Sequence, residues 1–155
     1  DFKIQPSSLE KITKRVIKDF SSFFKAKNCE VSFKALNKIP LINIDPLKIE
    51  QVIYNLISNA IRYSGTKGRV EIALEKKQGN IHFYCKDNGI GIPEEDKEKI
   101  FTKFYRSERA ITFSTGGSGL GLFISRAIIQ KSKGRIWFKS KENEGSTFCF
   151  SLPIN

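Results

Sequence analysis

The sequence contains no apolar stretch long enough to cross a membrane. No apolar run approaches the roughly 20 residues that a spanning helix needs. A signal peptide is also missing, and the chain does not begin with methionine. We therefore expect a fragment of a longer protein, in which residues 1–155 form one domain with a substantial core.

Cysteine and histidine are scarce. The three cysteines, Cys29, Cys85 and Cys149, are far apart, odd in number and without metal-ligand spacing. Each lies among alternating apolar residues, which favours buried, reduced thiols in a cytosolic compartment. His82 is the only histidine, so it is the only histidine in this chain that could accept a phosphoryl group.

Acidic residues are few in comparison with basic ones. The chain has 27 Lys and Arg against 16 Asp and Glu, which gives a net charge of +11. Such a charge attracts nucleic acid, an anionic membrane surface or an anionic ligand such as a nucleotide polyphosphate. The lysines are spread from Lys3 to Lys141, and no zinc spacing, RNA-binding aromatic signature or basic heptad helix accompanies them. A nucleic-acid-binding domain is therefore kept only as the weaker alternative.

Apolar residues are frequent and periodic. Hydrophobic residues make up 39% of the chain, and 13 Phe are among them, which is typical of a well-packed globular domain. The periodicity predicts helices at residues 8–28, 46–64 and after 120, and strands at 29–36, 69–76, 80–87, 134–140 and 146–152.

The order of these elements predicts the fold class. Consecutive strands look antiparallel, and the helices cluster rather than alternate strictly with the strands. We expect an α+β protein, a two-layer α/β sandwich in which helices cover one face of a mixed, mostly antiparallel sheet. A doubly wound parallel fold would need repeated crossovers.

The helix predicted at residues 46–64 has an unusual polar stripe. At about 100° per residue, Asn55, Asn59 and Arg62 lie on one side, and apolar residues fill the other. Asn is a poor helix former, because its amide competes for backbone hydrogen bonds. Two Asn one turn apart offer amide oxygens to a hard cation, and the guanidinium on the next turn suits an anion. Taken alone, the stripe could also be a solvated surface.

A glycine turn follows the strand predicted at 80–87. Asp87 ends that strand, and Gly89 and Gly91 would let a ligand approach the backbone. An ionised carboxylate only accepts hydrogen bonds, so Asp87 suits the exocyclic amino group of adenine and disfavours guanine, which has an oxygen there. An ordinary Asp-Asn-Gly turn is the alternative.

A second glycine cluster precedes the last predicted helix. Four of the eleven glycines lie in residues 116–121. Backbone N–H groups of such a loop, together with a helix N-terminus, bind phosphate. The segment matches neither the P-loop pattern nor the dinucleotide fingerprint. A flexible linker is the alternative, although this loop opens a helix whose predicted apolar face carries Phe123, Ala127 and Ile128.

These motifs form a specific set when they are taken in order: N-x-x-x-N, D-x-G-x-G, F-x-x-F and G-x-G-x-G. The chain resembles the ATP-binding catalytic domain of sensor histidine kinases, in the superfamily that includes gyrase, MutL and the large heat-shock chaperones. The resemblance covers residues 8–153 and implies the Bergerat-type ATP-binding fold. The boxes of that family match residues 45–64 (asparagine), 87–92 (first glycine), 101–105 (phenylalanine) and 117–122 (second glycine).

The resemblance implies a site for Mg-ATP with a distinct phosphate end. Asn59 would ligate Mg²⁺ through its amide oxygen, and Asn55 would lie beside it near the phosphates. Arg62 stands where many relatives have Lys, and Arg106 would reach the terminal phosphate. These four residues are the predicted catalytic group, and residues 107–118 would form the ATP lid.

At the adenine end, Asp87 would hold the amino group, helped by Gly91 and, through water, by Thr147. Tyr63 would pack near the base. The residues expected to bind nucleotide are Asn55, Asn59, Arg62, Tyr63, Asp87, Gly89, Gly91, Ile92, Gly117, Ser118, Gly119, Leu120, Gly121, Leu122 and Thr147.

One position separates kinases from ATPases within the superfamily. The hydrolysing members place a Glu at the position of Asn55, where it activates water, and an amide cannot act as a base. We therefore predict that the chain binds Mg-ATP and donates the γ-phosphoryl group to a histidine on a separate dimerisation domain of the same protein. A response regulator would act downstream. A nucleotide sensor or an anti-sigma-type Ser kinase is the alternative.

The resemblance also sets the expected cellular context. We expect a monomeric cytosolic fragment, a parent protein in the bacterial inner membrane, and no nucleic-acid partner. We also expect that this chain alone does not phosphorylate itself, because His82 lies on a strand between apolar neighbours that point to the opposite face.

Overall fold

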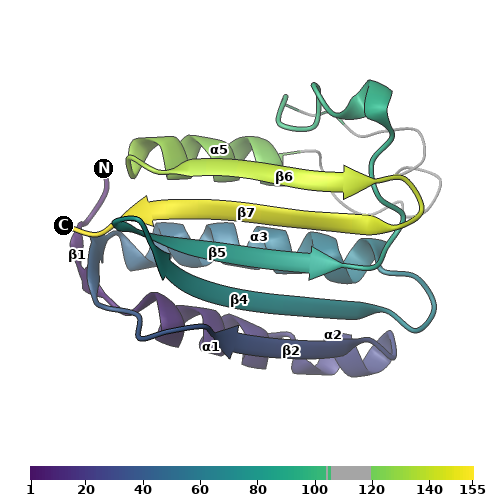
Figure 1. Ribbon diagram of the computed structural model, residues 1–155, viewed down its shortest axis with the longest axis horizontal. Helices are drawn as coiled ribbons and strands as arrows, with labels where there is room; N and C mark the ends of the chain where they lie inside the picture. The colour runs from purple at the N-terminus through teal and green to yellow at the C-terminus, as the bar shows by residue number, and fades with distance from the viewer. Residues whose placement is uncertain (104, 106–119) are drawn as a thin grey trace.

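The computed structural model describes residues 1–103, 105 and 120–155, and its main feature is a five-stranded sheet (Figure 1). The strand order is β2-β4-β5-β7-β6, with a parallel β2–β4 pair and antiparallel pairing elsewhere. The predicted mixed, mostly antiparallel sheet is therefore confirmed. The strands are β2 (Glu30–Ala35), β4 (Arg69–Lys77), β5 (Asn80–Asp87), β6 (Arg135–Lys141) and β7 (Gly145–Pro153).

The helices lie together behind this sheet in the view of Figure 1. None of the helices that the structure describes lies on the face turned to the viewer. This arrangement confirms the predicted α+β sandwich with one covered face. The remaining elements are α1 (Leu9–Asp19), α2 (Ser21–Ala26), α3 (Pro46–Tyr63), α5 (Gly121–Lys131), the 3₁₀ turn η1 (Glu94–Asp96), and the short paired strands β1 (Gln5–Ser7) and β3 (Ile42–Ile44).

Helix α3 is the central helix, and local sequence explains where it begins. Asp45 caps it: Oδ1 accepts hydrogen bonds from the backbone N–H groups of Leu47 (3.1 Å) and Lys48 (3.2 Å), and Oδ2 accepts one from Lys3 N (2.8 Å). Pro46 occupies the first helical position, where no N–H is needed. The whole predicted apolar face is buried: Ile49, Val52, Ile53, Leu56, Ile57, Ala60 and Ile61.

The helix predicted at residues 8–28 is wrong as a single element. It is divided at Phe20, whose ring is buried and lies 4.6 Å from the ring of Tyr54 on α3. Since α2 does not continue the face of α1, Phe23 is 56% exposed, although helical spacing from Phe20 would have placed it on the buried side. Strands β1 and β3 were not predicted, because three residues are too few for a period-2 pattern to emerge.

The predicted apolar face of α5 is also wrong in part. Phe123 and Ala127 are exposed. Ser125 and Ile129 are fully buried, and Ile128 is only 7% exposed. The buried Ser125 hydroxyl has a polar partner, because its Oγ accepts a hydrogen bond from Asn55 Nδ2 of α3 (3.3 Å). The side of α5 that faces the core therefore combines Ile128 and Ile129 with one polar contact to α3.

Two further observations complete the fold. Cys29, Cys85 and Cys149 are buried and unpaired, as predicted. In the described part of the chain, no helix combines the length and the apolar character of a membrane-spanning segment.

Candidate functional site

Segments that are distant in sequence meet along the C-terminal half of α3. The turn after β5 reaches the end of α3, where Ile90 N donates to the Tyr63 carbonyl (3.3 Å). The start of α5 lies against α3 about two turns earlier, where Asn55 Nδ2 donates to the Gly121 carbonyl (3.3 Å). Asn55 and Tyr63 are eight residues apart, which is about 12 Å along a helix. The predicted polar stripe therefore connects the start of α5 with the turn that follows Asp87.

Asp87 is a buried carboxylate with one oxygen bound and the other without a donor. Only 7% of the residue is exposed. Oδ1 accepts hydrogen bonds from Gly89 N (2.9 Å) and Ser146 N (3.3 Å). Among the residues that the structure describes, no group donates to Oδ2. Burial raises the pKa of Asp87 from 3.8 to about 6, against the opposing effect of the two backbone N–H bonds.

The two glycines of this turn are explained by packing within the protein. A Cβ at Gly89 would overlap the Tyr63 carbonyl oxygen, and a Cβ at Gly91 would overlap the Lys141 carbonyl oxygen. Gly91 also has φ +68°, in the left-handed region that favours glycine. The sequence predicted that these glycines admit a ligand. In this structure they admit the end of α3 and the β6–β7 hairpin.

Asn59 and Arg62 contact one another on the polar stripe. Arg62 Nη1 donates to Asn59 Oδ1 (3.2 Å), and Nη2 lies 3.4 Å from Ser58 Oγ. The guanidinium is also 5.8 Å from the centre of the Tyr63 ring. The amide oxygen predicted to ligate Mg²⁺ therefore accepts a hydrogen bond from the side chain predicted to contact phosphate.

Asn55 connects α3 to α5. Its amide nitrogen donates to the Gly121 carbonyl and to Ser125 Oγ, both at 3.3 Å. With the nitrogen held by these acceptors, the side chain is fixed at the beginning of α5. This is the place where the sequence predicts the phosphate groups, and the described residues Leu120, Gly121 and Leu122 lie there.

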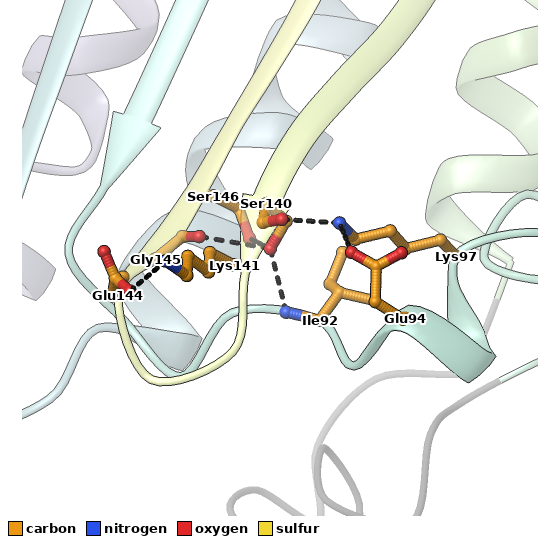
Figure 2. A network of polar contacts seen from close by, with 8 residues as sticks. All are labelled: Ile92, Glu94, Lys97, Ser140, Lys141, Glu144, Gly145 and Ser146. Atoms are coloured by element: carbon orange, nitrogen blue, oxygen red, sulfur yellow. Dashed lines mark hydrogen bonds and ion pairs between the residues drawn. The ribbon is translucent and has the colours of Figure 1, made fainter.

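Figure 2 shows a polar network that the sequence did not predict. Ile92 N donates to Ser140 Oγ (2.8 Å), and Ser140 Oγ lies 2.7 Å from Ser146 Oγ. Lys97 Nζ donates to the Ser140 carbonyl (2.6 Å) and contacts Glu94 Oε1 (2.6 Å). The network joins the segment after the glycine turn to the hairpin that carries Ser146.

The strand register changes the residue expected beside Asp87. Asp87 pairs with Ser146, whereas Thr147 pairs with Lys86 of β5 and Lys139 of β6. Paired residues share a face of the sheet and neighbours along a strand alternate, so Thr147 points to the face opposite Asp87. The structure therefore brings Ser146, and not Thr147, to the carboxylate. Alternation counted back from the buried Phe148 would have identified Ser146.

Some predicted residues cannot be placed. Arg106, Gly117, Ser118 and Gly119 lie outside the described residues, as does the lid predicted at 107–118.

The side chains present fit a metal ion only together with a nucleotide. Among the described residues, no group of three or more His, Cys, Asp or Glu could hold a metal. Asn59 offers a single amide oxygen, which suits Mg²⁺, and the remaining ligands would have to be phosphate oxygens and water.

His82 lies on the other face of the sheet from Asp87. It is five residues before Asp87 on the same strand, about 17 Å away, and an odd separation places the two on opposite faces. Its ring is 5.7 Å from that of Trp137, and its Nδ1 is buried without a hydrogen-bond partner. Burial lowers the pKa of His82, so the neutral imidazole is favoured.

Comparison with known proteins gives a consistent result. The model of the family described as histidine kinase-, DNA gyrase B- and HSP90-like ATPase matches residues 44–155. Sensor histidine kinase WalK of Bacillus subtilis is 43% identical over 114 residues, which cover 72% of this chain and 19% of that protein. Sensor protein kinase WalK of Staphylococcus haemolyticus is 37% identical over 155 residues, which cover 93% of this chain and 25% of that protein. The chain thus spans a quarter or less of these relatives.

Solved structures agree with the sequence relatives. The catalytic domain of histidine kinase ThkA superposes with a TM-score of 0.86 at 32% identity, covering 98% of this chain and 96% of that one. A structure of ThkA in complex with response regulator protein TrrA matches with a TM-score of 0.81 at 30% identity. The match covers 98% of this chain and 42% of that one.

Proposed function

The chain belongs to the family of histidine kinase-, DNA gyrase B- and HSP90-like ATPases, and from that premise we propose that it is the ATP-binding catalytic domain of a sensor histidine kinase. It binds Mg-ATP and presents the γ-phosphoryl group to a histidine on a dimerisation domain of the same protein. A response regulator then receives the phosphoryl group. The domain works in the cytosol, and the parent protein is anchored in the membrane.

The observation that carries this proposal is the buried Asp87 carboxylate. Its Oδ1 is held by two backbone N–H groups, so the carboxylate has a fixed orientation. Its Oδ2 has no donor among the described residues, and the amino group of adenine can supply one. Guanine presents a carbonyl oxygen at the same position, and two facing acceptors repel each other. The geometry therefore favours an adenine nucleotide.

The phosphate end of the site follows from the direction of α3. The polar stripe runs from the Asp87 turn to the start of α5, over about 12 Å, which suits an extended nucleotide. Between the two ends, the guanidinium of Arg62 supplies positive charge beside Asn59, and its attraction to phosphate would release the Asn59 amide oxygen for Mg²⁺. When bound, Mg²⁺ neutralises charge on the transferred phosphoryl group.

Neither Asn55 nor His82 is placed to activate water or to accept the phosphoryl group. Asn55 stands beside the phosphate end, but an amide is not a base and its nitrogen is held by Gly121 and Ser125. Activation of water by this residue is therefore not available. His82 faces away from the site. We therefore expect the acceptor histidine on another domain, and positioning in line with the phosphate is what this site contributes.

Isothermal titration calorimetry with ATP and GTP, each with Mg²⁺ and with EDTA, tests the proposal. We expect ATP binding that requires Mg²⁺ for full affinity, and GTP binding that is at least about tenfold weaker. A helical-hairpin domain with the cognate histidine is then added with labelled ATP, and acid-labile label should appear on that domain. Equal affinity for both nucleotides, or label on serine instead of histidine, would contradict the proposal.

A further inference from the structure

Asp87, Ser146 and Ser140 form one row across three neighbouring strands. Asp87 of β5 pairs with Ser146 of β7, and Ser146 pairs with Ser140 of β6. Paired residues lie on the same face of the sheet, so the three side chains share the face that carries the proposed adenine site. Ser140 is therefore one strand beyond the residue that contacts Asp87. It has no contact of its own with the carboxylate.

The hydrogen bonds of Ser140 can be assigned from its neighbours. Ile92 N–H, 2.8 Å from Ser140 Oγ, can only donate. The Gly145 carbonyl, 3.1 Å away, can only accept. The third neighbour, Ser146 Oγ at 2.7 Å, can do either. A hydroxyl has one proton and two lone pairs. All three contacts are hydrogen bonds only if Ser140 donates to Gly145 and Ser146 donates to Ser140.

This assignment fixes the polarity of Ser146. Its single proton points to Ser140, so toward any other group Ser146 Oγ can only accept. Asp87 Oδ2, in the same row, also only accepts while the carboxylate is ionised. The adenine end of the site then presents acceptors from both side chains.

We propose that Ser140 is a positioning residue that sets base specificity: by taking the proton of Ser146, it prevents the Ser146 hydroxyl from donating toward the base. The inference rests on the proposed function, because it assumes that the base of a nucleotide lies against Asp87. A base with an amino group at the recognised position satisfies both acceptors, directly or through a water molecule. A base with a carbonyl oxygen there, as in guanine or hypoxanthine, finds no donor in the side chains of Asp87 and Ser146.

Replacing Ser140 by Ala removes the group that accepts the proton of Ser146. The Ser146 hydroxyl loses its acceptor and becomes able to donate toward the base. The binding of GTP and ITP should then improve relative to ATP, and the ratio of their dissociation constants to that of ATP should fall by about three- to tenfold. Ser140→Thr keeps the hydroxyl and should retain the ratio of the unmodified protein.

The double variant Ser140→Ala with Ser146→Ala gives the most direct control. It removes the hydroxyl that the single variant has released, so the preference for ATP should return. Ser132→Ala is a matched control elsewhere, since Ser132 Oγ donates to the Ile128 carbonyl (2.8 Å) at the end of α5. It should leave all three dissociation constants unchanged.

The measurement is calorimetric titration of each variant with Mg-ATP, Mg-GTP and Mg-ITP, after thermal unfolding has shown that the variant is folded. The inference is overturned if Ser140→Ala weakens all three nucleotides by the same factor, if Ser140→Thr behaves like Ser140→Ala, or if the double variant stays as permissive as the single one. Should Ser140→Ala fail to fold, Ser140→Cys replaces it, because a thiol is a weak acceptor. If the unmodified chain does not bind ATP, the proposed function fails first, and this is a separate result.

Discussion

The substitution Asp87→Asn should strengthen the fold and weaken nucleotide binding at the same time. In the absence of nucleotide, the ionised carboxylate is held in a buried site that favours its neutral form, and its pKa is raised from 3.8 to about 6. Asn has nearly the same shape and no charge, and its oxygen can still accept the N–H bonds of Gly89 and Ser146. The variant therefore removes the cost of burying the charge and keeps the local structure.

The size and the pH range of the effect follow from the two pKa values. Since the pKa in the folded state is higher than in the unfolded state, the folded state binds more protons between them, and stability falls as pH rises from about 4 to about 6. At about 1.4 kcal/mol per pH unit, the loss at neutral pH is up to about 3 kcal/mol. Asp87→Asn should recover this amount above pH 6 and little of it near pH 4. For a chain of this size, the gain corresponds to roughly 6 to 12 °C in melting temperature.

Binding should change in the opposite direction. The Asn amide can place a donor against the amino group of adenine and leave a buried pair unmatched, at about 1–3 kcal/mol. The dissociation constant for ATP should rise by about 5- to 150-fold. Urea unfolding without nucleotide at pH 4.5 and 7.5, together with calorimetry with Mg-ATP at pH 7.5, measures both effects on one sample.

Asp45→Asn is the matched control. Asp45 is also buried, but three backbone N–H bonds, that of Lys3 foremost, lower its pKa, so its loss of charge should destabilise the fold at pH 7.5. Its ATP affinity should not change. If Asp87→Asn is no more stable than the unmodified chain at pH 7.5, the carboxylate is not desolvated as argued. If its ATP affinity is unchanged, Asp87 is not in the adenine site.

Three other predictions concern the metal, the acceptor and the glycine turn. Asn59→Ala should remove the Mg²⁺ dependence of ATP binding with the fold intact, because Asn59 lies on the polar stripe. Calorimetry with and without EDTA should then give the same affinity, and a difference as large as in the unmodified chain would exclude the metal role. The chain alone should give no acid-labile phosphoprotein with labelled ATP, since His82 faces away from the site; strong labelling that disappears in His82→Ala would overturn this. Gly91→Ala should destabilise the fold by at least about 2 kcal/mol, because the residue has φ +68° and its Cβ would overlap the Lys141 carbonyl. Urea unfolding measures this loss, and an unchanged midpoint would show that the turn can rearrange.

Short-range rules in the sequence determined the main elements of the fold and pointed to the residues proposed for the site. The cap and proline at Asp45 and Pro46 set the start of α3, and the 3.6-residue period identified its buried face. The period-2 pattern located the strands of the main sheet to within a residue or two at most ends. Asp87 could be selected because a carboxylate at the end of a strand, followed by glycines, is a local pattern. These features depend on neighbours a few residues away, so the sequence contains them directly.

Tertiary structure alone decided which residues meet. Asp87 lies beside Ser146, 59 residues later, because β5 and β7 pair in one register, and a shift of one residue would have brought Thr147 there instead. Asn55 contacts Gly121 and Ser125 across 66 and 70 residues, and α5 turns the polar Ser125, rather than Phe123, toward the interior. Phe20 interrupts a helical pattern at the residue whose ring packs on Tyr54. In each case a long-range contact selected among options that were locally equivalent, and local periodicity has no information about that choice.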